Sequence, residues 1–442
     1  MYMKQLFTFL FAVICMAQTA QAQLPAERLD TAYGRWRAGG YGEMLLSRKD
    51  YGLNRFTGSA NGSTRQNHAD VSIPRFVLAG DYKISKKWIL SAEIEFEAGG
   101  TGMEYEMEAQ SGSENGEYET EMEKGGEVAL EQFHLTRLVV PEFNVRVGHL
   151  IMPVGLVNTH HEPLNFFGAA RPEGATTIMA STWHETGVEF FGEVGKGLAS
   201  FDYEALITAG LNPNGFDIYN WVKKGKQGFF ETDNFSAPAY TLRVNWKGVR
   251  GLRVGGSVFY NPNAGKNADK LITYDGTDKI NVLIYNFDAQ YIHRYFTARF
   301  NYTGGNITNT VGLTAINKSY SSLSPYSRKG PVAKRAVDWF VEAGADLKGI
   351  FSNVEKMPAL FPFVHYNYYN TQESVATGLT ADNRCQVSLW TVGVNYRILP
   401  NLVAKLDYTT RQIGTHKMFG KGEYNSENEI RLGLAYNLWV FR

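Results

Sequence analysis

The chain is poor in cysteine, carries no net charge and, after its first residues, has no long apolar run. Only two cysteines occur among its 442 residues, and Cys15 lies in a stretch typical of a cleaved export signal. The cysteine that remains, Cys385, cannot form an intramolecular disulfide alone, which excludes a disulfide-stapled secreted fold. The 44 basic and 44 acidic residues balance, so the basic excess of a nucleic-acid-binding protein is missing and no nucleic-acid partner is expected.

The N-terminal apolar run, Leu6 to Met16, is too short to cross a bilayer as a helix, which takes roughly 20 residues. Lys4 precedes this run and the small-residue sequence Ala20-Gln21-Ala22 follows it, so we predict a signal peptide over residues 1–22. The alternative is a buried N-terminal helix. Removing 22 residues leaves 420, which begin with a short periplasmic lead-in at 23–34. Since no later run reaches the roughly 18 apolar residues of a membrane helix, a helical membrane protein is excluded.

Aromatic residues make up 14% of the chain and glycines number 45, a composition typical of transmembrane β-strands with aromatic girdles. Segments of roughly ten residues alternate apolar and polar side chains, which is the period of a strand with two different faces. From Trp88 to Glu97, apolar side chains occupy every second position, and a serine and three glutamates occupy four of the other five. The last segment, Ile430 to Val440, alternates in the same way.

Short and long connections alternate between these segments, which separates a membrane barrel from a soluble sandwich. Residues 83–87 and 140–142 are short connections, whereas 98–124 and 153–182 are long ones. We predict an all-β, transmembrane, antiparallel β-barrel over 35–442, with about 16 strands, long external loops and one loop folded into the lumen. An even strand number places both termini on the periplasmic side, and sixteen strands leave room for an aqueous lumen. The strands are expected to begin near Arg37, Ser72, Trp88, Leu130, Phe143, Glu185, Leu198, Tyr240, Gly251, Leu283, Tyr295, Val337, Ala359, Gln386, Asn401 and Asn428.

The most informative stretch is 144–193, in which a strand ending at Gly148-His149 meets Pro153-Val154-Gly155-Leu156. A loop of about thirty residues follows, and the chain re-enters a strand at Glu185-Thr186-Gly187. Together with Gly40-Tyr41-Gly42-Glu43 in the first strand, this pattern resembles the phosphate-selective porin O/P family of Gram-negative outer membranes. The resemblance implies a sixteen-stranded pore, homo-trimers, and a third external loop, 153–183, that folds inward as a constriction.

Polar residues of this loop and its borders are the candidate constriction residues, because ions at a narrow point lose water and need substitute partners. They are His160, His161, Glu162, Arg171, Glu173 and His184. Three histidines and nearby glutamates also raise the alternative of a transition-metal site. The spacing does not favour it, because adjacent histidines diverge on an extended chain and no H-x-x-x-H or C-x-x-C pattern occurs. We therefore expect no metal and no cofactor.

The inward face of the barrel follows from the alternation and carries both signs of charge. The lumen charges are expected to include Arg75, Arg146, Arg243, Arg253, Arg299, Lys405, Arg431, Glu93 and Glu95. Phosphate selectivity needs an excess of arginine or lysine along the path, and no arginine ladder or lysine cluster stands out. The phosphate preference of the family is therefore not transferred on sequence grounds.

The acidic run 104–123 lies in the expected second external loop. It could bind divalent cations that bridge lipopolysaccharide or slow the entry of anions, but a disordered, solvated loop is the preferred interpretation. No G-x-S-x-G elbow, phosphate-binding glycine loop or zinc motif occurs, so neither a catalytic site nor an enzyme is expected. His365, in a strand and facing inward, is the one histidine we would test for catalysis.

The predicted function is passive diffusion of small hydrophilic solutes or ions, with anions such as phosphate among the candidates, through a porin in the bacterial outer membrane. The alternative is a surface adhesin or a structural barrel that transports nothing. Phe441, the penultimate residue of the chain, ends a final strand that resembles the signal read by the barrel assembly machinery. The expected partners are therefore outer-membrane lipid and lipopolysaccharide, this machinery, the permeating solutes and a second and third copy of the chain.

Overall fold

The computed structural model describes residues 34–56, 58, 66–98, 104–107, 120–123, 128–180, 182–227, 232–268, 279–319, 330–354, 357–414 and 426–441. The predicted signal peptide, and the lead-in up to residue 33, lie outside these described residues. Within them, no helix is both long and apolar enough to cross a membrane.

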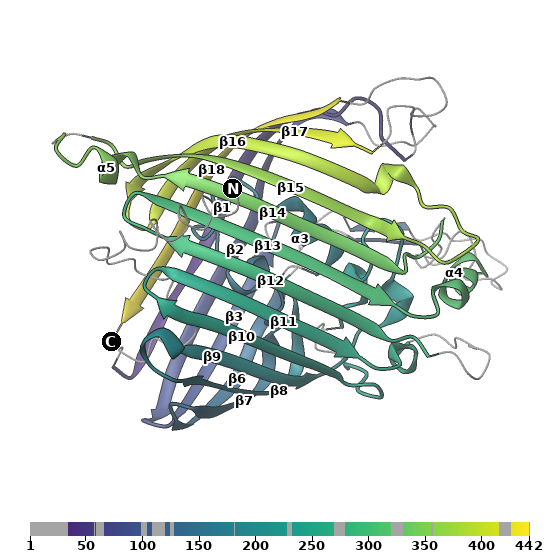
Figure 1. Ribbon diagram of the computed structural model, residues 1–442, viewed down its shortest axis with the longest axis horizontal. Coiled ribbons are helices and arrows are strands. Elements are labelled where there is room, and N and C mark those ends of the chain that lie inside the picture. Colours follow the sequence, from purple (N-terminus) through teal and green to yellow (C-terminus); the bar gives the residue numbers. More distant parts are fainter. Residues whose placement is uncertain are drawn as a thin grey trace, which may run out of the picture.

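Sixteen strands form one closed antiparallel barrel, in which each strand pairs with its neighbours along the chain and β1 pairs with β18 (Figure 1). The barrel strands are β1 (Trp36–Asp50), β2 (Asn67–Ser85), β3 (Trp88–Glu97), β6 (Val128–Val140), β7 (Phe143–Ile151), β8 (His184–Val194), β9 (Phe201–Thr208), β10 (Ala239–Val249), β11 (Leu252–Asn261), β12 (Val282–Ile292), β13 (Phe296–Ile307), β14 (Arg335–Ala345), β15 (Leu360–Ser374), β16 (Gln386–Leu399), β17 (Leu402–Ile413) and β18 (Ser426–Phe441). The predicted fold class and strand number are therefore confirmed.

Most strands begin within two residues of the predicted positions, because the alternation marks them clearly. Two differ by more. Strand β2 begins at Asn67, five residues before the expected Ser72, and it continues through Pro74. Strand β9 begins at Phe201 rather than near Leu198, because residues Gly197–Ala199 form the 3-10 turn η1.

The two faces of the barrel wall differ as the alternation requires. On β17, Lys405 and Asp407 are each 2% exposed, whereas Leu406 and Tyr408 are 44% and 46% exposed on the outer face. The register between β17 and β18 places Asp407 beside Arg431, so opposite charges meet on the inner face. An apolar exterior around a charged interior is the reverse of the arrangement in a soluble protein and suits a barrel surrounded by lipid.

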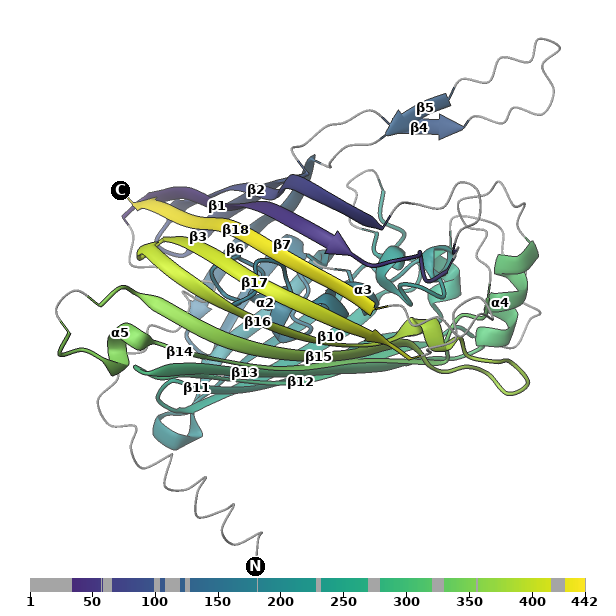
Figure 2. The same cartoon turned by 90° about the horizontal axis from the view of Figure 1, so that it is seen from above.

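The long connections lie at one end of the barrel and the short turns at the other (Figures 1 and 2). The long connections carry helices α2 (Leu156–Thr159), α3 (Glu173–Ile178) and α4 (Thr310–Ser319) and the 3-10 turns η2 (Pro213–Gly215), η3 (Lys223–Gly225), η4 (Ala264–Asn267) and η5 (Asn383–Cys385). One connection at the short end, between β14 and β15, is longer than a turn and contains α5 (Leu347–Ile350), which the sequence pattern did not predict.

The acidic segment between β3 and β6 is not wholly irregular. Strands β4 (Glu104–Met107) and β5 (Thr120–Glu123) pair with each other in a separate two-stranded sheet. The prediction of a disordered loop over 104–123 is therefore wrong for these two strands. The sequences of these strands, EYEM and TEME, place glutamate at every second position, which is the period of a strand.

An apolar cluster closes the loop end of the barrel over strands β9 to β14. It joins the inner-face side chains at those strand ends to residues of several connections, and Trp183, Trp221 and Phe259 are among its largest members, each at most 1% exposed. The ring centroids of Trp183 and Phe259 are 4.7 Å apart. Side chains of this size exclude water, so this part of the interior is dry.

Candidate functional site

The connection between β7 and β8, residues 152–183, folds into the barrel, and its helices α2 and α3 lie within the ring of strands (Figure 2). Asn158 fastens the base of this inward loop. Its side-chain amide donates to the carbonyls of Met152 and Trp183 at 2.7 and 3.0 Å, and its Oδ1 accepts from the Trp183 backbone N–H at 2.6 Å. Gly155, with φ at +80°, allows the turn directly before α2.

The tip of the inward loop is held against strand β17. The Lys405 ammonium donates to the carbonyls of Pro163, Phe166 and Gly168 at 2.5, 2.8 and 2.9 Å. Asp407 on the same strand accepts from the Ala169 backbone N–H at 2.6 Å. A lysine that uses three donors on one stretch of backbone fixes that stretch rather than presenting its charge to solutes.

Helices α2 and α3 contact the wall at strands β13 to β15. Asn301 of β13 accepts from the Leu156 N–H at 3.0 Å, and Asn367 of β15 accepts from the Gly174 N–H at 2.7 Å. Both amides cap helix N–H groups that have no intrahelical partner. Leu156 also packs in a small buried cluster with Phe340 of β14.

The predicted constriction residues fall into two groups on this loop. In the first, His160 lies 3.0 Å from an Arg253 Nη atom, and His161 lies 3.8 Å from a Glu131 carboxylate oxygen. Glu162, the next residue, accepts a hydrogen bond from the side-chain amide of Asn437. These contacts place His160, His161 and Glu162 against the wall at β11, β6 and β18.

The second group, Arg171 and Glu173, faces a polar space between the loop and the wall of β14 to β18. Glu342, His365 and Arg431 line this space from the wall. Glu173 is held by Arg411, whose Nη2 lies 2.5 Å from its Oε2, and by the Tyr369 hydroxyl at 2.8 Å. A second space adjoins it and shares Pro172 and Glu342 with the first.

His184 lies outside the loop as the first residue of β8, where its ring contacts that of His149 on β7. The two ring centroids are 4.6 Å apart. Because its side chain is directed at this neighbour, His184 lines neither of the two spaces.

Burial changes the ionisation of the loop residues in different directions. It lowers the pKa of His161 to about 4, so the imidazole is neutral near pH 7. It raises the pKa of the Glu162 carboxyl. For Glu173 burial alone would raise the pKa, but the guanidinium of Arg411 outweighs it and the pKa is lowered.

The predicted lumen charges all lie on the inner face, and each arginine among them has an acidic partner within 4 Å. The pairs are Arg75 with Glu95, Arg146 with Glu189, Arg243 and Arg253 with Asp288, Arg299 with Glu342, and Arg431 with Asp407. Arg243 donates to both Asp288 oxygens at 2.9 and 2.8 Å. Pairing cancels much of the field that an unpaired arginine would present to an anion.

Some residues of the site were not predicted from the sequence. Glu131, Tyr369 and the asparagines Asn158, Asn301 and Asn367 hold the loop or face it, yet none is in a recognisable motif. The four of these residues that lie on strands share one signal, which is a polar side chain at an inward position of an alternating strand. Asn158 lies within the loop and has no such signal.

Comparison with known proteins gives the fold a name. No model of a known protein family matches the sequence. The outer membrane channel DcaP of Acinetobacter baumannii superposes with a TM-score of 0.54 at 12% identity, over 94% of this chain and all of that one. OmpF of Salmonella typhi, in complex with daunomycin, gives 0.54 at 11% identity over 91% and 97% of the two chains. The chain has the fold of an outer-membrane porin.

Two further proteins are similar to this porin-like chain. The anion-selective porin of Comamonas acidovorans has a TM-score of 0.52 at 10% identity, with 91% of this chain and 99% of that one covered. An uncharacterized protein of Aquifex aeolicus is 24% identical over 327 residues, which are 72% of this chain and 66% of the relative. The match thus spans just under two thirds of that relative. Identities this low support the shared barrel and leave function to be argued from the site.

Proposed function

We propose that this chain is a diffusion channel of the bacterial outer membrane, with residues 153–183 as its constriction. The observation that carries the proposal is the polar space between the inward loop and the wall of β14 to β18. Arg171 and Glu173 from the loop face Glu342, His365 and Arg431 there, so both walls offer partners to a hydrated solute. Small hydrophilic solutes and ions are the substrates that match the polar groups of this lining.

The outer surface supports a membrane location. Large apolar side chains such as Val392, Leu406 and Ile430 point outward and are 44–50% exposed. A belt of this kind on a closed barrel matches the hydrocarbon layer. Outer-membrane lipid and lipopolysaccharide, the barrel assembly machinery and a homo-trimer are the partners that we propose with this location, together with export by a signal peptide over 1–22.

The charge arrangement favours weak selectivity. In the described residues the inner-face arginines discussed above are paired with carboxylates, as with Arg431 and Asp407 at 2.7 Å. Membership of the phosphate-selective porin O/P family is the finer proposal, and it rests on the residues around Pro153-Val154-Gly155. Anions such as phosphate are among the solutes that we propose to diffuse through the channel. We do not expect the wall to bind them tightly, because its arginines are paired with carboxylates and leave little excess positive charge.

Single-channel recording in planar lipid bilayers tests the channel. Thr391 on β16 lines the polar space and is 3% exposed, whereas its neighbour Val392 is 50% exposed on the outer face. We expect stepwise conductance from the wild type, a large loss of conductance in Thr391→Trp, and no change in the matched control Val392→Trp. A folded wild-type barrel without conductance steps would contradict the proposal and favour an adhesin or structural barrel.

A further inference from the structure

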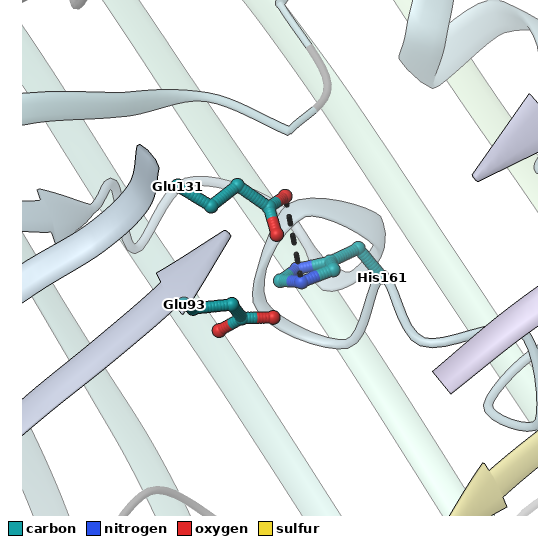
Figure 3. A group of neighbouring side chains, drawn as sticks. All are labelled: Glu93, Glu131 and His161. Carbon is teal, nitrogen blue, oxygen red and sulfur yellow. Dashed lines mark ion pairs between the residues drawn. The ribbon is translucent and has the colours of Figure 1, made fainter. Parts of the chain in front are cut away.

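Two glutamates of the barrel wall and one histidine of the inward loop meet in the interior (Figure 3). Glu93 comes from β3, Glu131 from β6 and His161 from the loop, and one donor atom from each lies within 4.8 Å of the other two. The three residues are 8%, 0% and 7% exposed. They are distant in sequence, so the closed barrel and the inward loop together create this cluster.

The hydrogen bonds of His161 fix which ring nitrogen is free. Its Nδ1 lies 2.9 Å from the carbonyl oxygen of Asn158, which only accepts, so Nδ1 carries the hydrogen. In a neutral imidazole, Nε2 then has an unshared electron pair, and it lies 3.8 Å from Oε1 of Glu131. Within the described residues this oxygen accepts no hydrogen bond, although the carboxylate is fully buried.

Two electron-pair donors therefore face each other without a hydrogen between them. The Tyr41 hydroxyl lies 2.9 Å from a Glu93 oxygen and 3.2 Å from Oε2 of Glu131, but its single hydrogen cannot fully satisfy both carboxylates. Such an arrangement is unfavourable in a buried site unless a positive charge lies between the donors.

The surrounding charges leave this cluster negative. Glu43 and Glu95 join Glu93 and Glu131 around Arg75, whose guanidinium lies 3.8, 3.1 and 3.8 Å from Glu43, Glu95 and Glu131. The second guanidinium that interacts with these carboxylates is that of Arg171. With all of these groups ionised, four carboxylates and two guanidiniums leave two negative charges. One divalent cation compensates this excess.

We propose that Glu93, Glu131 and His161 bind a divalent transition-metal ion of the zinc class, which joins the inward loop to strands β3 and β6. One imidazole nitrogen and two carboxylate oxygens suit zinc and similar ions, and small side-chain rotations bring them to the roughly 2.0–2.2 Å of metal–ligand bonds. The Asn158 carbonyl on Nδ1 and the Gln132 amide on Glu93 are the outer partners that orient such ligands. Calcium and magnesium prefer oxygen donors only, so they fit this cluster less well.

Two alternative explanations of this cluster make different predictions. A proton shared by Glu93 and Glu131 would reduce the charge without any metal. The histidine pair His149–His184, whose rings touch nearby, would bind zinc without involving His161 or Glu131. The experiment therefore has to measure binding itself and to separate the two histidine clusters.

Isothermal titration of the detergent-purified full-length barrel with ZnCl₂, after removal of metal by EDTA and dialysis, tests the site. We expect one zinc ion per chain, no comparable heat with CaCl₂, and at least a tenfold loss of affinity in both His161→Ala and Glu131→Gln, consistent with the 10–100-fold effects of disturbing a metal site. His365→Ala is the matched control, because this buried histidine also faces a carboxylate, that of Glu342, at 3.2 Å. Its zinc affinity should equal that of the wild type.

Folding of each variant is verified by its heat-modifiable migration on gels, and Glu131→Gln keeps the side-chain shape in case His161→Ala disturbs the loop. The absence of zinc binding by the folded wild type would overturn the proposal and support the shared proton. Zinc binding that survives in both His161→Ala and Glu131→Gln but disappears in His149→Ala would overturn it in favour of the histidine pair. Neither outcome depends on conductance, so the channel proposal is tested separately.

Discussion

The two sides of the barrel interior differ in how they hold the inward loop. Towards β9–β14, large apolar side chains such as Trp183 and Phe259 pack the base of the loop into a dry cluster. Towards β14–β18, Lys405, Asp407 and Arg411 hold the loop by hydrogen bonds and ion pairs, and a space lined by polar side chains remains.

This difference shows how one loop serves two purposes. Apolar packing seals one side, because close-packed side chains leave no room for water. Polar contacts on the other side leave donors and acceptors beside a space that water and ions can enter. The route of permeation is therefore expected along β14–β18, and the following variants test each side in turn.

The largest effect is expected on the apolar side. Trp183→Ala removes a side chain that is 1% exposed, packs on Phe259 and donates to Glu185 at 3.0 Å. A cavity of this size should lower the free energy of unfolding by about 3–5 kcal/mol, measured by urea denaturation in detergent. Phe235→Ala, at a residue that is 52% exposed, is the control and should change it by less than about 0.5 kcal/mol. If both variants lowered the free energy of unfolding by the same amount, the apolar cluster around Trp183 would not be the tightly packed, sealed side that we describe.

A smaller effect is expected where the loop is held by polar contacts. Lys405→Met leaves the carbonyls of Pro163, Phe166 and Gly168 without their donor, which should cost about 1–3 kcal/mol of unfolding free energy. The looser loop should also make the open-channel current noisier. Lys348→Met, on the exposed face of α5 at the other end of the barrel, should alter neither quantity. An undisturbed current in Lys405→Met would show that this lysine does not hold the loop.

The ion pair of Glu173 and Arg411 gives a pH-dependent effect of about 1 kcal/mol, since the pair is only partly buried. The pKa of Glu173 is lower in the folded protein than its ordinary value near ~4.3, so its stabilisation is present above that pH and lost as the pH falls through the lower folded value. The wild type should therefore unfold at higher urea concentration than Glu173→Gln at pH 7, and this difference should shrink as the pH falls through the folded-state pKa. A difference that stays constant between pH 7 and strongly acidic pH would mean that the charge of Glu173 is not its source.

The smallest effect concerns selectivity. Because the wall arginines are paired, the reversal potential in a tenfold KCl gradient should lie well below the ~59 mV of an ideally selective channel. Arg431→Gln leaves Asp407 without its partner at 2.7 Å beside the polar space, so the reversal potential should move towards cation selectivity. Phosphate in place of chloride should change the wild-type value little. A near-ideal anion potential would instead support the phosphate preference of the family that the sequence resembles.

The sequence predicted the barrel well because its signals are local. Alternation along Trp88–Glu97 or Ile430–Val440, and the contrast of short and long connections, need no knowledge of distant contacts. The contacts of the inward loop are different. Lys405 meets Phe166 across 239 residues, and this meeting depends on barrel closure and on the path of the loop.

The same reason explains why a metal site was not expected. Spacing rules detect ligands on one helix or one turn, and His160-His161 offers no such pattern. The cluster of Glu93, Glu131 and His161 combines two strands with a loop, so only the folded chain brings them together. The hairpin of β4 and β5 was missed for a simpler reason, because the many glutamates concealed a strand period.

The most direct test of the central claim compares cysteine modification on the two sides. In a Cys385→Ser background, Thr409→Cys places the only thiol beyond residue 22 on the polar space, and Ala336→Cys places it in the apolar cluster. Addition of a charged methanethiosulfonate reagent during bilayer recording should reduce the current through Thr409→Cys and leave Ala336→Cys unchanged. A block confined to Ala336→Cys would place the route of permeation on the side that we describe as sealed.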